Sequence, residues 1–200
     1  MPAPIDFYFD FSSPYGYFAA QKINVIAEKH DRAVNWKPIL LGAIFKITGS
    51  RPLVNMPLKS DYAARDMSRL ARLLDVPFTL PARFPIATQA AARAFYWAQQ
   101  RDPRLARELA LTLYHAYFAD GRDISNPETV ADIAAGLGID RVQLTAALGD
   151  GAIKERLKNE VDAAIARKVF GSPFIIIDDE PFWGVDHLDQ VERWLATGGW

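Results

Sequence analysis

The hydrophobic pattern begins with a strand, a helix and a second strand. Residues 5–10 (IDFYFD) are short, aromatic and typical of a buried strand, and the turn-forming sequence Ser12-Ser13-Pro14 follows directly. From residue 14 to about 30, apolar residues recur every three or four positions, which predicts one helix. Residues 34–37 predict a second strand, ended by Pro38.

The middle of the chain, from about residue 40 to 170, is rich in Ala, Leu and Arg and has helical periodicity. It predicts six helices, at residues 60–75, 88–101, 104–119, 127–137, 140–149 and 152–169. Asn126-Pro127 is typical of a helix start, and Gly136 with Gly138 of its end. Asp140 has the spacing of a capping box with Gln143.

Strand character returns in the last thirty residues. Residues 174–177 and 181–183 predict a hairpin around the turn at 178–180, and residues 188–196 predict a final amphipathic helix. The element order predicts an α/β protein with a thioredoxin-like fold and a large all-helical insertion. We expect a discontinuous domain of residues 1–40 and 170–200, and a helical insertion domain of residues 41–169.

The amino-acid composition excludes several classes of function. With 50% hydrophobic residues, 24% charged residues and a net charge of −1, the 200 residues predict one folded body that binds a small molecule or a protein, not nucleic acid. The chain has no cysteine, which excludes disulfides and redox chemistry by its own sulfur. No membrane span or signal segment is evident, so we expect a cytoplasmic protein. The three histidines lack ligand-like spacing, and no metal site is predicted.

The first turn carries the main candidate chemistry. Ser13-Pro14-Tyr15-Gly16 opens the first predicted helix, where unpaired backbone N–H groups and the helix dipole favour an anion. Ser13 can donate a hydrogen bond to a thiolate that a ligand supplies. It is not expected to be a nucleophile, because no histidine lies in this segment to act as a base. On these residues alone, a simple Ser-Pro helix cap is the favoured alternative.

Two later segments add candidate binding residues. Ser172-Pro173 precedes the returning strand, and a cis bond there would leave backbone free to pair with a bound peptide. The alternative is an ordinary proline at the start of a strand. Trp183-Gly184-Val185-Asp186 offers a tight turn and a carboxylate. Asp186 either binds a ligand amine or caps the last helix.

The segments 9–15, 169–174 and 182–186 (FDFSSPY, VFGSPF and FWGVD) together resemble a known family. They are similar to the 2-hydroxychromene-2-carboxylate isomerases and the kappa-class glutathione transferases, relatives of the DsbA-like disulfide oxidoreductases. The resemblance covers residues 5 to 195. Ser13-Pro14-Tyr15-Gly16 stands where those oxidoreductases have a Cys-Pro-Tyr-Cys redox motif. The resemblance therefore implies that a ligand's sulfur replaces the protein's own.

The resemblance also implies the ligand and its contacts. Glutathione would be the cofactor, with its thiolate on Ser13 and its cysteinyl backbone paired with Ser172, before Pro173. Its γ-glutamyl end would be held by Trp183, Gly184, Val185 and Asp186, with Asp186 facing the ammonium group. Lys59 would lie near the glycyl carboxylate, and Asn55 would contact substrate. For Lys59 and Asn55, a solvated lysine and a turn asparagine are equally good interpretations.

The implied activity is the interconversion of 2-hydroxychromene-2-carboxylate and trans-o-hydroxybenzylidenepyruvate by reversible addition of the glutathione thiolate. The substrate would be a small aromatic carboxylate, and relatives of this type predict a homodimer. A kappa-like glutathione transferase or peroxidase is the enzymatic alternative. A non-catalytic thioredoxin-like binding module is the distant one.

Overall fold

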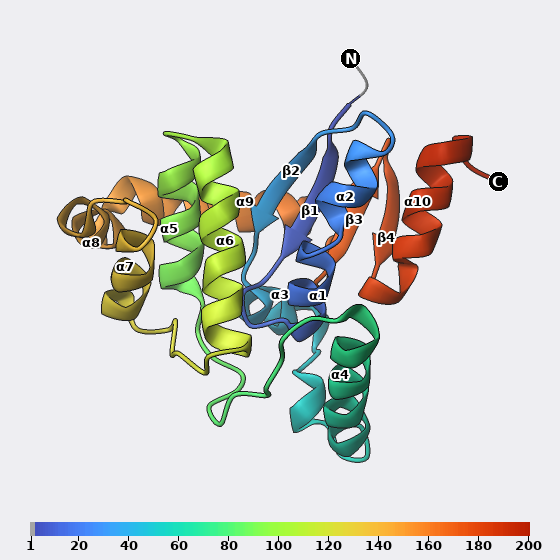
Figure 1. Ribbon diagram of the computed structural model, residues 1–200, viewed down its shortest axis with the longest axis horizontal. Coiled ribbons are helices and arrows are strands. Elements are labelled where there is room, and N and C mark those ends of the chain that lie inside the picture. Colours follow the sequence, from blue (N-terminus) through green and yellow to red (C-terminus); the bar gives the residue numbers. More distant parts are fainter. Residues whose placement is uncertain (1–2) are drawn as a thin grey trace.

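The computed structural model describes residues 3–200, and its centre is a four-stranded mixed sheet (Figure 1). The strands are β1 (Ile5–Phe9), β2 (Val34–Pro38), β3 (Phe174–Ile177) and β4 (Glu180–Trp183). Their order in the sheet is β2-β1-β3-β4, with β1 parallel to β2 and the other neighbours antiparallel. The predicted thioredoxin-like fold is confirmed.

Helices make up the rest of the described structure. They are α1 (Pro14–Ala20), α2 (Ile23–Glu28), α3 (Leu41–Thr48), α4 (Ser60–Leu74), α5 (Gln89–Gln99), α6 (Pro103–Phe118), α7 (Pro127–Ala135), α8 (Arg141–Gly149), α9 (Gly151–Ala166) and α10 (Leu188–Thr197), with the short 3-10 helices η1 (Leu53–Asn55) and η2 (Val185–His187). Each described element between residues 41 and 169 is helical. None of the described helices is long and apolar enough to cross a membrane.

Strand alternation places side chains on both faces of the sheet. Ile5, Phe7 and Phe9 point into the large core, whereas Tyr8 belongs to a second apolar cluster on the opposite face. The large core includes residues from α1, α2, α5, α6 and α10, and the second cluster includes residues from α3 and α9. One buried cluster thus runs through both predicted domains. The division at residues 41 and 169 stays a prediction.

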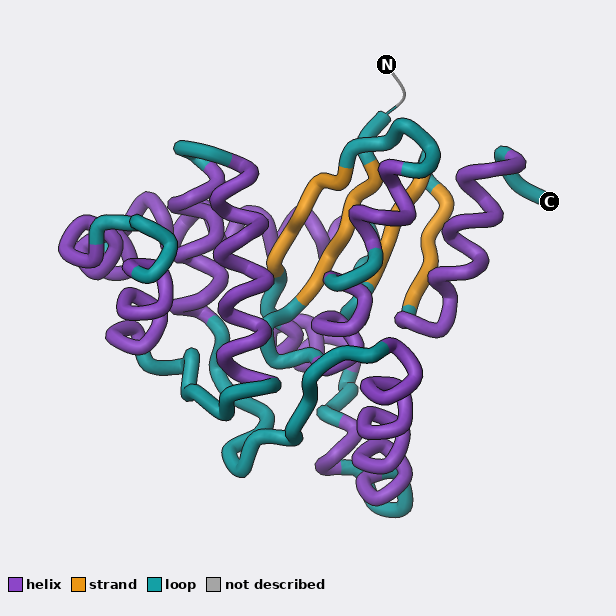
Figure 2. The backbone as a smooth tube through the Cα atoms, viewed as in Figure 1, coloured by secondary structure: helices purple, strands orange, loops and turns teal. Residues whose placement is uncertain are grey.

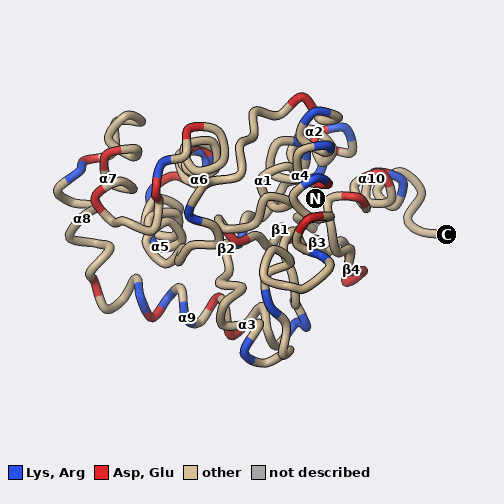
Figure 3. The backbone as a smooth tube through the Cα atoms, turned by 90° about the horizontal axis from the view of Figure 1, so that it is seen from below, with Lys and Arg blue, Asp and Glu red and all other residues tan. Residues whose placement is uncertain are grey.

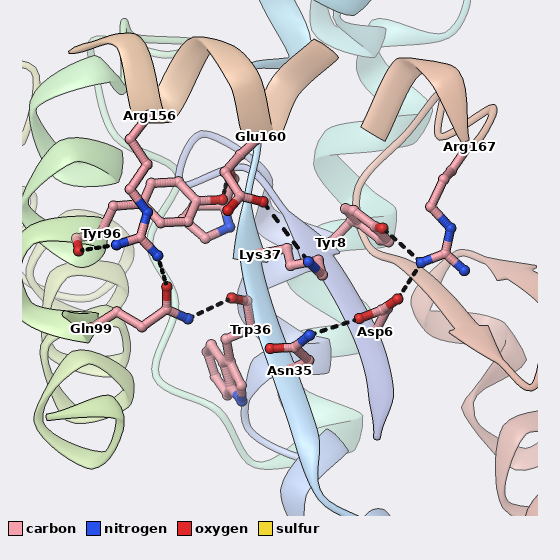
Figure 4. Close-up of polar contacts among 11 residues, drawn as sticks. Asp6, Tyr8, Asn35, Trp36, Lys37, Tyr96, Gln99, Arg156, Glu160 and Arg167 are labelled. Atoms are coloured by element: carbon pink, nitrogen blue, oxygen red, sulfur yellow. Dashed lines mark hydrogen bonds and ion pairs between the residues drawn. The ribbon is translucent and has the colours of Figure 1, made fainter. Parts of the chain in front are cut away.

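Helix α5 covers the free edge of β2 (Figure 4). The Tyr96 hydroxyl donates to the Pro38 carbonyl at 2.8 Å, and the Gln99 amide donates to the Trp36 carbonyl at 3.4 Å. Arg156 from α9 donates in turn to the Gln99 side chain at 2.7 Å. These side chains occupy carbonyl groups that an unpaired edge strand would otherwise expose. The strand includes Pro38, one residue more than predicted.

The single helix predicted for residues 14–30 is wrong, because the segment forms two helices. Gln21 N–H donates to the Phe18 carbonyl and Lys22 N–H to the Ala19 carbonyl, which are the short-range bonds of a tighter turn. No glycine or proline marks this break, so the apolar periodicity continues across it. Helix α1 therefore has only seven residues.

Positive and negative residues are interspersed along the helices, as Figure 3 shows for α9.

The long connection from α4 to α5, residues 75–88, runs past the carboxyl end of β1 (Figure 2). Its Ile86 N–H donates to the Ser12 hydroxyl at 3.2 Å. The loop therefore closes over the turn that carries Ser13.

Candidate functional site

Ser13 lies in the turn between β1 and α1 and is almost fully buried, with 5% of its surface exposed. Its hydroxyl oxygen accepts from the Gly16 N–H at 3.0 Å, so Ser13 caps α1. The same hydroxyl donates to the Ser172 carbonyl at 2.9 Å. The alternative that Ser13 caps the helix is therefore correct. It is incomplete, because the hydroxyl also joins two segments that are 159 residues apart in sequence.

Ser172 and Pro173 form the second side of the site. The Ser172-Pro173 peptide bond is cis. Ser172 is buried, and its hydroxyl accepts from the Asp10 N–H at 2.9 Å, which fixes the residue against the end of β1. The Pro173 carbonyl accepts from the Gly184 N–H at 3.0 Å. Pro173 thus directly precedes β3, and its carbonyl joins the predicted peptide-binding segment to the later turn.

Trp183 and Gly171 shape the rim of the site. The indole of Trp183 is 53% exposed and lies against Gly171 so closely that a Cβ there would collide with the indole ring. Phe170 packs on the same indole, with the ring centroids 5.0 Å apart. The tryptophan is therefore held by its neighbours while half of its surface remains available to a ligand.

The turn at Gly184 presents a carboxylate. Gly184 has φ 103°, and a Cβ at this position would collide with the Asp186 carboxylate, so glycine is required. The Asp186 side chain is 79% exposed, and the Nδ1 of His187 lies 3.6 Å from its carboxylate. Helix α10 begins at Leu188 with His187 at the N-cap position and no side-chain cap. The alternative that Asp186 caps the last helix is therefore wrong.

Asn55 and Lys59 lie in a different part of the structure. Asn55 ends η1, Lys59 precedes α4, and both are exposed. Neither side chain is hydrogen-bonded to Ser13 or Ser172. Helix α4 itself is joined to the first turn, because the Tyr15 hydroxyl donates to Asp66 at 2.8 Å. Burial and this carboxylate raise the pKa of Tyr15. Whether Asn55 and Lys59 can reach a ligand bound at Ser13 therefore depends on the position of α4.

Asp10 is a structural component of the site that the sequence analysis did not single out. Its buried carboxylate accepts from the Ser12 N–H at 2.8 Å, the Leu41 N–H at 2.6 Å and the Thr88 hydroxyl at 2.8 Å. Burial raises the pKa of Asp10, while these three hydrogen bonds act in the opposite direction. The signal for this residue in the sequence was an aspartate directly after the aromatic strand of residues 5–9.

Gly16 is packed beneath the same turn. A Cβ on Gly16 would lie 2.7 Å from the Tyr114 hydroxyl and 2.8 Å from the Ser172 hydroxyl. The Tyr114 hydroxyl donates to the Asp10 carbonyl at 2.8 Å and is fully buried. The space that a second cysteine would need in a redox motif is therefore filled by Tyr114 and Ser172.

Comparison with known proteins identifies the family. The family model described as a DsbA-like thioredoxin domain matches residues 4–196. The chain belongs to the DsbA-like thioredoxin domain family. Within this family, our chain lacks cysteine and has Ser13 and Gly16 at the two ends of its first-turn motif.

Two relatives show which DsbA-like proteins are similar. A 2-hydroxychromene-2-carboxylate isomerase of Pseudomonas putida is 30% identical, over 94% of this chain and 92% of its own. Glutathione S-transferase kappa 2 of Caenorhabditis elegans is 27% identical, over 96% of this chain and 91% of its own. The resemblance to the isomerases and the kappa-class transferases is confirmed over nearly the full length.

The same result comes from structure. A solved structure of a 2-hydroxychromene-2-carboxylate isomerase superposes with a TM-score of 0.85 at 29% identity, and covers 96% of this chain and 94% of its own. The similarity therefore includes the helices between the two parts of the sheet as well as the DsbA-like sheet itself.

Proposed function

We propose that this protein is a glutathione-dependent isomerase that interconverts 2-hydroxychromene-2-carboxylate and trans-o-hydroxybenzylidenepyruvate. Nearly full-length similarity to isomerases of that name supports the substrate. The observation that carries the proposal is the buried Ser13 hydroxyl against the Ser172 carbonyl, in a chain without cysteine. This pair offers polar groups for an external thiol and no sulfur of its own.

The residues at the site fit glutathione. Ser13 would hold the thiolate, and the backbone of Ser172 before Pro173 would pair with the cysteinyl backbone. The half-exposed Trp183 and the turn Gly184-Val185 would hold the γ-glutamyl end, with Asp186 facing its ammonium group. The Asp186 carboxylate is 79% exposed, and no lysine or arginine among residues 3–200 forms an ion pair with it, so it suits that role. Lys59 would meet the glycyl carboxylate, and Asn55 the aromatic substrate.

When bound, glutathione supplies a thiolate that adds reversibly to a conjugated carbon of the substrate, so that a double bond becomes single and can rotate. The chain's contribution is to hold the thiol in place and to stabilise its anionic form through a hydrogen bond from Ser13. The surrounding Asp10 network fixes that serine. The Ser13 hydroxyl is hydrogen-bonded to Ser172 and Gly16 and not to a histidine, so the structure gives it no base that would make it a nucleophile.

A kappa-like glutathione transferase or peroxidase is the second candidate, and the kappa-class relatives at 22–27% identity favour it. In that reaction the same bound thiolate would attack an electrophile and remain in the product. A non-catalytic thioredoxin-like module remains the distant alternative. We also propose a cytoplasmic homodimer, with a small aromatic carboxylate as substrate and no nucleic-acid partner.

The amount of free thiol during the reaction distinguishes these three functions. The purified protein should equilibrate the chromene carboxylate and the benzylidenepyruvate only when glutathione is present, while the total free thiol stays constant. Absorbance of the two isomers and titration of free thiol measure both quantities in one reaction. Consumption of thiol in proportion to product would instead establish the transferase. Glutathione binding without either reaction would leave the binding module.

A further inference from the structure

In the structure, the hydrogen of the Ser13 hydroxyl already takes part in a hydrogen bond within the protein. A hydroxyl has one hydrogen, and here it is donated to the Ser172 carbonyl at 2.9 Å. The oxygen meanwhile accepts from the Gly16 N–H at 3.0 Å. A thiolate can accept a hydrogen bond from Ser13 only after the bond to Ser172 has broken.

Breaking that bond has a cost. Both Ser13 and Ser172 are buried, and no other donor to the Ser172 carbonyl is found among residues 3–200. Ser172 cannot turn away easily, since its own hydroxyl accepts from the Asp10 N–H at 2.9 Å. Redirecting Ser13 towards a ligand would leave a buried carbonyl without a partner, which is unfavourable.

A suitable ligand can supply the missing donor. In a cysteinyl peptide, an amide N–H is attached to the carbon next to the one that bears the thiol. If this N–H pairs with the Ser172 carbonyl as an added strand would, the carbonyl remains satisfied and the Ser13 proton is free to turn to the sulfur. A thiol without that N–H leaves Ser13 bound to Ser172.

We propose that the Ser172 carbonyl is a specificity determinant, which lets Ser13 stabilise only those thiolates whose neighbouring carbon carries an amide N–H. This rests on the proposed function and deepens it, because it names the class of thiol that the site activates. Simple alkyl thiols are excluded even where they fit, since they cannot replace Ser13 as donor to Ser172.

The test compares glutathione with its ester analogue, in which oxygen replaces the cysteinyl amide N–H. The γ-glutamyl and glycyl ends are identical, so both should bind, the analogue about tenfold more weakly for one lost hydrogen bond. The pKa of each bound thiol is read from the ultraviolet absorbance of the thiolate across pH. Glutathione should show a thiol pKa lowered by about one to two units, and the analogue one that is unchanged.

Two variants locate the effect. In Ser13→Ala, bound glutathione should lose the lowered thiol pKa. Its affinity relative to the analogue should rise, because the Ser172 carbonyl now has no donor in the free protein. Ser12→Ala is the matched control: its hydroxyl accepts from the Ile86 N–H instead, so the thiol pKa should stay lowered.

An equally lowered thiol pKa for the bound analogue would overturn the proposal. Failure of the analogue to bind would also overturn it, because the amide would then serve binding and not the turning of the Ser13 hydroxyl from Ser172 to the sulfur. Failure of glutathione itself to bind would contradict the proposed function. The two hypotheses therefore fail in distinguishable ways.

Discussion

At the scale of single residues, the site is defined by close packing around the first turn. Gly16 shows this most clearly, because Tyr114, Ser172 and Ser13 occupy the space around its missing side chain. Asp10 supplies the polar counterpart by joining backbone and side-chain donors from three segments. Ser13 is thus positioned by groups that a substitution would displace.

Gly16→Ala should therefore destabilise the protein by about 1–3 kcal/mol, the usual cost of overpacking a buried position. Gly42→Ala is the control, because its Cβ would meet nothing within 4 Å in α3. The control should be neutral or stabilising by about 0.5–1 kcal/mol. Denaturant unfolding measures both. Equal stability of Gly16→Ala and the wild type would contradict the packing described.

Asp10 predicts a pH dependence. Because burial raises its folded pKa above the ordinary value of 3.8, the folded state holds this proton more tightly than the unfolded state. The resulting stability is fully present below the ordinary pKa and is lost as pH rises through the folded pKa. The free energy of unfolding of the wild type should therefore fall relative to that of Asp10→Asn above about pH 4. Parallel pH curves for the two proteins would refute this assignment.

At the scale of elements, the joint between α1 and α4 connects the first turn to the segment with Asn55 and Lys59. It consists of the Tyr15 hydroxyl on Asp66, whose carboxylate also pairs with Arg69 on α4. Loss of this hydrogen bond would loosen α4 without touching Ser13. We therefore expect the position of α4 to affect the binding of glutathione more than the rate of the chemical step.

Tyr15→Phe should raise the KM for glutathione several-fold and leave kcat nearly unchanged, because only the placement of α4 is altered. Tyr62→Phe is the control: its hydroxyl is exposed and receives only a 3.4 Å contact from Arg69. Steady-state kinetics at varied glutathione separates KM from kcat. A large fall in kcat with unchanged KM would show that Tyr15 has a different role.

Most helix and strand positions were predictable because local signals determine them. Asn126 and Asp140 cap α7 and α8 as their spacing predicts. The turn at Asp178-Asp179 has both residues at positive φ, as a tight hairpin requires. The break between α1 and α2 was missed because it follows from hydrogen bonding around Gln21 and Lys22, without a glycine or proline.

At the scale of the whole molecule, the site depends on contacts that no local pattern reveals. Ser13 and Ser172 come from opposite ends of the chain, and Thr88 reaches Asp10 from the long loop between α4 and α5. Their proximity follows from the order of strands in the sheet. For this reason the resemblance to a family placed the candidate residues together, whereas periodicity alone indicated only a helix cap.

Isomerase turnover by Ser13→Ala tests the central claim most directly. At saturating glutathione, the variant should lose about 10²–10³-fold in kcat, the loss typical when one preorganised donor to a developing anion is removed. Its free energy of unfolding should fall by about 2–4 kcal/mol, because the variant loses the helix cap and leaves the Ser172 carbonyl without a donor. Ser12→Ala should retain most activity. Full glutathione-dependent activity in folded Ser13→Ala would contradict the role assigned to this serine.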